Sequence, residues 1–122
     1  MAYEYELKNL TLTAGEDFSS VGQFRAVTVT DDDACESLAA SSNLVVGILQ
    51  NNPPEGSACE VGYAGVTKAE AGGTVGAGVH VVADADGKVV AAGTGGAGTQ
   101  VLGLALNGAG ADGELISVLL LR

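Results

Sequence analysis

A glycine-rich segment is the first candidate for chemistry in this sequence. Residues 93–98 (GTGGAG) match the G-x-G-x-x-G spacing found in dinucleotide-binding sites. That motif needs a helix directly after it, because the N-terminus of the helix holds the pyrophosphate. Here the continuation Thr99–Gly103 is typical of a strand. The segment is therefore predicted to be a flexible loop between strands, and no cofactor is expected.

Two acidic segments are candidates for cation binding. Asp84-Ala85-Asp86-Gly87 resembles the start of a calcium loop, but Lys88 and Gly95 occupy positions where such a loop needs oxygen ligands. The segment 84–87 is therefore predicted to be a hairpin turn. The run Asp31–Asp33 could gather a cation, although a solvated loop or the start of a helix explains it more simply. No metal site is predicted.

His80 and two cysteines complete the candidates for catalysis. A single histidine cannot form a zinc site with Cys35 and Cys59, which are far apart in the sequence, and no nucleophile motif accompanies it. In Val79-His80-Val81 the alternation places His80 on the exposed face of a strand. The cysteines are expected to be buried thiols, with a disulfide between them as the alternative. An enzyme is not predicted.

Composition indicates one small acidic domain. The 122 residues carry a net charge of −10, are 47% hydrophobic but only 4% aromatic, and include 19 glycines. Such charge repels phosphate backbones, so no nucleic-acid partner is expected. The N-terminus lacks a basic and apolar targeting pattern, and the apolar runs are too short to span a bilayer. We therefore expect a soluble protein that is made and used without crossing a membrane, with no membrane partner.

Short strands separated by turns dominate the sequence pattern and predict an all-β fold of about seven strands. Val and Thr alternate in the first of these strands, and tight turns rich in glycine, asparagine and aspartate separate the others. A compact barrel or sandwich is the architecture that fits best. The expected strands are residues 24–30, 44–50, 58–66, 79–83, 88–92, 101–106 and 114–121.

Two other segments have a different character. Residues 31–40 could form one short helix, with acids at its N-terminus where the helix dipole favours them. Residues 1–20 carry two of the three tyrosines and are interpreted as an N-terminal arm that pairs with a neighbouring chain. An ordinary first strand is the alternative. The domain division is accordingly 1–20 for the arm and 21–122 for the β-domain.

An internal repeat is visible at an offset of 56 residues. Val45–Asn51 (VVGILQN) matches Val101–Asn107 (VLGLALN), and each copy continues through a loop into a further strand. The repeat indicates a barrel built from two similar halves. Convergent composition in a chain rich in valine and glycine is the alternative.

Residues 44–121 resemble the cement, or decoration, proteins that stabilise the heads of tailed bacteriophages. The resemblance rests on the order of short strand motifs and turns, with no catalytic signature among them. The motifs are residues 47–51 (GILQN), 61–69 (VGYAGVTKA), 77–84 (AGVHVVAD), 88–92 (KVVAA), 101–105 (VLGLA) and 113–120 (GELISVLL).

The resemblance implies a small β-barrel-like or β-tulip-like module on the outer surface of the capsid. Its implied partners are the major capsid protein and further copies of itself, as homotrimers at local threefold positions that bridge adjacent capsomers. Contacts with the capsid or a neighbouring chain are expected in the arm, where an added strand can pair with an exposed edge. The candidate contact residues are Tyr3, Tyr5, Leu7, Leu10 and Leu12.

Two other functions remain open from the sequence. One is a virion module of the tail or a fibre, which would share the all-β composition. The other is a soluble ligand-binding barrel or enzyme, which would need a pocket with converging polar groups. Tyr63 is a further possible contact, with a place in the core as the alternative.

Overall fold

The computed structural model describes residues 2–121, and within them the chain forms strands, turns and loops but no helix. The all-β prediction is therefore confirmed. The two strands beyond the expected seven are β1 and β3, which fall in the predicted arm and the predicted helix. The strands are β1 Tyr5–Ala14, β2 Ala26–Asp31, β3 Ala34–Ser37, β4 Gly47–Leu49, β5 Ala58–Glu70, β6 His80–Ala83, β7 Val89–Ala91, β8 Gly103–Ala105 and β9 Leu115–Leu120.

The short helix considered for residues 31–40 is wrong. The chain turns at Asp31–Asp33 and returns as β3, which pairs with β2 on one side and β1 on the other. Asp33 has a φ of 55°, a left-handed conformation that aspartate tolerates in tight turns. Cys35 in β3 is fully buried, whereas its neighbours are partly exposed. The alternation of a strand therefore outweighs the preference of acids for a helix N-terminus.

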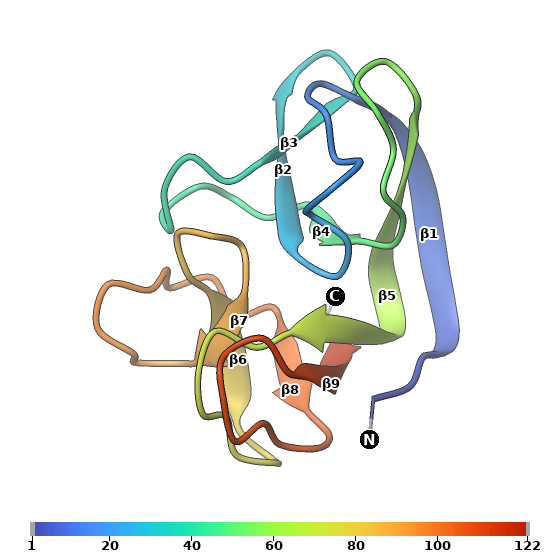
Figure 1. Ribbon diagram of the computed structural model, residues 1–122. Coiled ribbons are helices and arrows are strands. Elements are labelled where there is room, and N and C mark those ends of the chain that lie inside the picture. Colours follow the sequence, from blue (N-terminus) through green and yellow to red (C-terminus); the bar gives the residue numbers. More distant parts are fainter. Residues whose placement is uncertain (1, 122) are drawn as a thin grey trace.

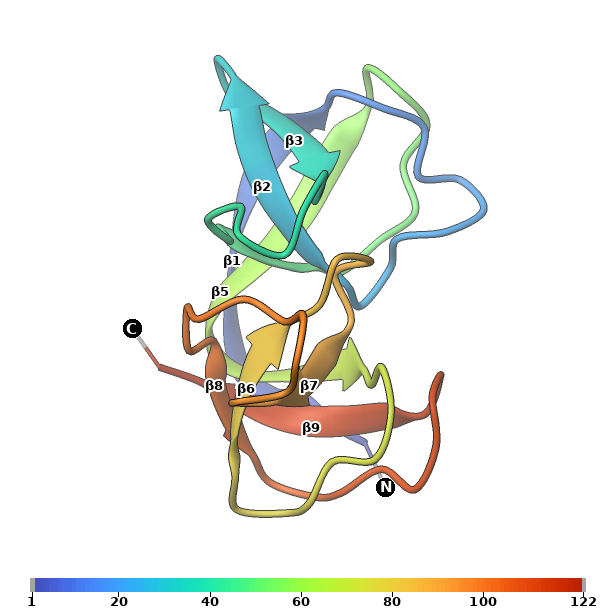
Figure 2. The same cartoon turned by 90° about the vertical axis from the view of Figure 1, so that its left-hand side faces the viewer.

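All nine strands belong to one mixed sheet in the order β1-β3-β2-β4-β5-β9-β8-β6-β7. Because β1 also pairs with β5, the first five strands of this order close into a ring, and the other four continue from β5 (Figures 1 and 2). The long strand β5 belongs to both parts and changes direction between them (Figure 1). Gly65 lies in this strand with a φ of 97°, at the register where β5 passes from pairing with β1 to pairing with β9.

The internal repeat appears as two similarly paired halves, a first half of β2–β5 and a second half of β6–β9. In each half a hairpin is followed by a strand that pairs with its first member, and then by a strand at the centre of the sheet. Asn51 Oδ1 accepts the N–H of Glu60 at 3.0 Å, and Asn107 Oδ1 accepts that of Ser117 at 2.9 Å. The predicted repeat is thus confirmed by matching topology and matching side-chain hydrogen bonds.

Two clusters of buried apolar side chains hold the structure together. One cluster belongs to the ring and includes Phe18, Leu49 and both cysteines. The larger cluster includes Ile48 of the first half and Ile116 of the second half. Since most of its members are valine and alanine, neighbouring strands can approach closely, and apolar burial supplies the main driving force for this fold.

Candidate functional site

The segments considered for cofactor or cation chemistry lie in turns and loops. Residues 93–98 connect β7 and β8, and no helix follows them in the described chain. Asp84–Gly87 forms the predicted turn between β6 and β7. Asp84 Oδ1 accepts the N–H groups of Asp86 at 2.9 Å and Lys88 at 3.0 Å. The Asp84 carboxylate therefore closes this turn.

His80 begins β6 and is exposed, whereas Val81 beside it is fully buried. Its predicted position on the outer face of a strand is confirmed. Within residues 2–121, no three His, Cys, Asp or Glu side chains gather closely enough to hold a metal ion. No helix in this range could span a membrane.

Cys35 and Cys59 are free, fully buried thiols in the ring cluster. Burial raises the pKa of the Cys35 thiol far above its ordinary value of 9.0, and it raises the pKa of Cys59 as well. A thiol held neutral in this way is a poor nucleophile. The two cysteines therefore contribute to packing in this structure.

We expect these thiols to make the protein less stable in alkaline solution. Above pH 9.0 the thiols of the unfolded chain ionise while the folded thiols stay neutral, so unfolding releases protons and becomes easier as pH rises. Denaturant midpoints measured from pH 8 to pH 10.5 should fall more steeply for the native protein than for a variant with Cys35→Ala and Cys59→Ala. Equal slopes would contradict the assignment.

A network of four charged side chains ties the two halves together. Arg25 Nε lies 3.1 Å from Glu70 Oε1, and Lys88 Nζ lies 3.5 Å from Glu70 Oε2 and 2.9 Å from Asp112 Oδ1. The hydrogen bond to Asp112 raises the pKa of Lys88. Because these groups neutralise one another and belong to both halves, their arrangement is structural.

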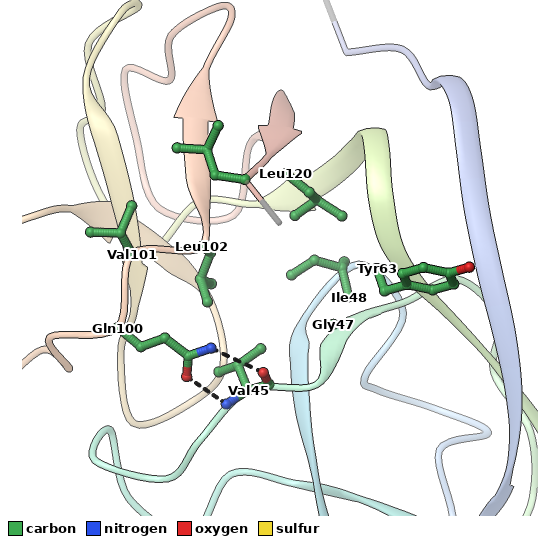
Figure 3. Close-up of a pocket in the computed structure, with 9 residues that line it drawn as sticks. Val45, Gly47, Ile48, Tyr63, Gln100, Val101, Leu102 and Leu120 are labelled. Atoms are coloured by element: carbon green, nitrogen blue, oxygen red, sulfur yellow. Dashed lines mark hydrogen bonds between the residues drawn. The ribbon is translucent and has the colours of Figure 1, made fainter.

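Three hollows of the structure are small. One of about 40 Å³ lies between the halves, where the Gln100 side chain bonds the backbone N–H of Val45 at 2.7 Å and its carbonyl at 3.1 Å (Figure 3). Tyr63 also lines this hollow. Two further hollows measure about 160 and 170 Å³. Pockets for small-molecule ligands usually exceed about 300 Å³, so none of the three fits a ligand carrier or an enzyme.

The predicted contact residues divide into two groups. Tyr3 and Tyr5 are 44% and 63% exposed. Tyr3 is held by Ser117 of β9, whose Oγ accepts the Tyr3 N–H at 2.6 Å and donates to the Tyr3 carbonyl at 3.0 Å. The chain before β1 therefore runs beside β9, as both views show (Figures 1 and 2).

Leu7, Leu10 and Leu12 are half-buried and face inward. Leu10 and Leu12 pack against the ring cluster, and Leu7 packs against the larger cluster. The pairing of β1 with β5 is irregular around Lys8, and this bulge changes the face to which the following side chains point. Residues 5–14 thus form a strand that pairs within its own chain, as the alternative interpretation of this segment expected. A contact of these leucines with another chain stays a prediction.

Two exposed tyrosines and three leucines line the outer surface of the second half. Directly paired residues of neighbouring strands share one face of a sheet, and the pairs Tyr5–Val66, Val66–Leu119 and Leu119–Leu104 cross four strands. We call this surface the apolar face and define it by Tyr3, Tyr5, Leu104, Leu106 and Leu119.

Sequence reasoning found the tyrosines of the apolar face but missed its leucines. In β9 the buried residues Ile116, Val118 and Leu120 alternate with others, among which Leu119 is 37% exposed. In a continuous apolar run, the sequence does not distinguish buried from exposed positions, because large aliphatic residues occupy both. The only signal was the excess of large apolar residues over what one buried face requires.

Comparisons with known proteins show a family for this chain and a solved structure of similar fold. A family model described as phage cement protein matches residues 6–120. The crystal structure of the head fiber gp8.5 N base of bacteriophage phi29 is similar in fold, with a TM-score of 0.70, 18% sequence identity and 95% of each chain covered. Among curated proteins, no sequence matches this chain.

Proposed function

The chain belongs to the phage cement protein family, and we propose that it binds the outer surface of a capsid and stabilises the expanded head by bridging adjacent capsomers. As a member of this family it is a structural protein of the virion rather than an enzyme. The major capsid protein is the proposed partner, and the ring of β1, β3, β2, β4 and β5 is the proposed barrel-like module.

The apolar face is the observation that carries this proposal. Large exposed apolar patches on small proteins mark surfaces that contact other proteins, and tyrosine is enriched in such contacts. Tyr5, at 63%, is the more exposed of the two tyrosines on this face. On a chain with a charge of −10, such a face would be costly to leave in water without a partner.

Trimers at local threefold positions are the proposed form on the capsid. A trimer multiplies each weak contact by three, and the resulting avidity holds a small protein on a lattice without large interfaces. Tyr3 and Tyr5 are the proposed contact residues of the N-terminal segment, and Leu7, Leu10 and Leu12 hold this segment on the core.

We expect Tyr5→Asp to lower occupancy on heads by about 10-fold or more, because it puts a charge into an apolar contact and every copy of the trimer carries it. Quantitative mass spectrometry of gradient-purified heads would give the ratio of this chain to the major capsid protein. Val21→Asp is the matched control, because Val21 is 52% exposed in a loop outside the apolar face. Equal occupancy of the two variants would show that head occupancy depends neither on a direct contact of the apolar face with the capsid nor on a contact between copies through it.

The same measurement decides between this function and a second candidate. The similarity in fold to a head fiber base covers 95% of the chain and favours the base of a fibre as that candidate. A simple, high ratio to the major capsid protein supports the cement function. A few copies per virion would support a fibre or a tail module instead.

A further inference from the structure

Acidic residues are distributed unevenly between the two parts of the chain. Eleven of the 15 acids lie in residues 1–70 and four in residues 71–122, and residues 89–111 contain no charged residue. The strands β6, β8 and β9 carry neither acid, lysine nor arginine. The second half therefore presents a surface of low charge on a strongly acidic protein.

Two cations of the described chain form no ion pair with an acid. Within residues 2–121, Arg25 and Lys88 form ion pairs, whereas Lys8 and Lys68 form none. Lys68 is paired with Ser117, next to Tyr3, and its Nζ lies 5.9 Å from the ring centroid of Phe24. Lys68 thus places a positive charge close to the apolar face.

We propose that the apolar face is the surface through which copies of this chain contact one another. Each copy carries a charge of −10, so two copies repel unless they approach through a region that is poor in acids. The strands β8 and β9, which carry Leu104 and Leu119, meet this condition. The apolar face also supplies aromatic side chains, which are enriched in contacts between proteins. The inference rests on the proposed trimer and names the surface that forms it.

A closed threefold ring uses two different surfaces, because each copy contacts its two neighbours through different patches. The surface that matches the apolar face is the rim of the hollow in Figure 3, where Val101 and Leu121 are 41% and 45% exposed. Leu44, which is 77% exposed, precedes Val45 and lines a neighbouring hollow that shares Gln100 with this one. Charged side chains are absent from the residues that line this hollow. The rim is therefore apolar and uncharged, and the leucines of the apolar face lie on segments without charged residues, whereas Glu4 and Glu6 flank Tyr5.

Sedimentation velocity of the purified chain tests the inference without heads. From about 1 µM to about 1 mM, we expect the native protein to associate into trimers, and added salt to strengthen association because it screens the repulsion between acidic copies. Tyr5→Asp and Leu44→Asp should each raise the dissociation constant by about 10-fold or more. Val21→Asp should associate like the native protein, and circular dichroism verifies that each variant is folded.

Mixing the two variants tests the pairing of the surfaces. Tyr5→Asp keeps an intact rim and Leu44→Asp keeps an intact apolar face, so the mixture should form a dimer that neither variant forms alone. If Tyr5→Asp fails to fold, Leu106→Asp serves in its place. Native protein that stays monomeric up to about 1 mM, or a Tyr5→Asp variant that associates normally, would overturn the inference.

Head occupancy separates this inference from the proposed function. A chain that is monomeric in solution and still occupies heads at a high ratio would leave the cement function standing and overturn the assigned contact between copies. A chain that forms trimers and never binds heads would support the contact and overturn the cement function.

Discussion

Replacing Gly65 by alanine is expected to lower the free energy of unfolding by about 3 kcal/mol. Gly65 has a φ of 97°, which costs a residue with a side chain energy wherever it occurs. In addition, a Cβ at this position would lie 2.3 Å from the carbonyl oxygen of Glu6 and 2.9 Å from the Cα of Leu7. Because these atoms belong to the backbone of β1, the clash can be relieved only by separating β1 from β5.

Gly56→Ala is the matched control for this effect. Gly56 has a similar φ of 86°, but a Cβ there would meet no atom within 4 Å. Its replacement should cost only the conformational penalty, about 1 kcal/mol. Denaturant unfolding of both variants measures the difference. Equal losses would mean that the close approach of β1 does not constrain Gly65.

Phe18→Ala is expected to cost about 3–5 kcal/mol, in the range of large-to-small changes in protein cores. Phe18 is 1% exposed although it lies in the loop between β1 and β2. It belongs to the ring cluster, and its N–H bonds the carbonyl of Pro53 at 2.8 Å. The aromatic ring also packs closely on Gly22, where a Cβ would lie 2.5 Å from Phe18 Cδ1. Truncation to alanine would therefore leave a cavity beside Gly22.

The control for Phe18 is Val21→Ala in the same loop. Val21 is 52% exposed, so its truncation should change the free energy of unfolding by less than about 0.5 kcal/mol. Equilibrium unfolding in denaturant compares the two variants. A small loss of unfolding free energy for Phe18→Ala would show that this loop does not contribute to the buried core of the ring.

Binding of this protein to heads is better tested by point substitutions than by deleting the N-terminal segment. Deleting residues 1–14 would remove β1, which pairs with both β3 and β5 and whose leucines pack on the core. The deletion would open the ring, and a loss of head binding would then report unfolding. Point changes at exposed positions such as Tyr5 keep the strand and change only the surface.

Several features of this protein could be read from the sequence. Turn residues determine local backbone geometry, so the turn at Asp84–Gly87 and the loop at residues 93–98 were predictable. The internal repeat also predicted the two similar halves of the structure. Gly47 and Gly103 occupy equivalent positions, and a Cβ at either would lie within 2.3 Å of a carbonyl oxygen of the neighbouring strand.

Only the tertiary structure decided which partner each strand takes and which face meets water. From the sequence, the acids at Asp31–Asp33 fit the start of a helix as well as a turn. The structure shows the turn, because β3 pairs with β1 on one side and β2 on the other. The alternation of apolar and polar residues in β1 did not reveal the bulge near Lys8, which turns Leu10 and Leu12 toward the ring. Sequence encodes local propensity and spacing, whereas burial depends on what other strands bring to the same place, and for that reason the apolar face became visible only in the folded chain.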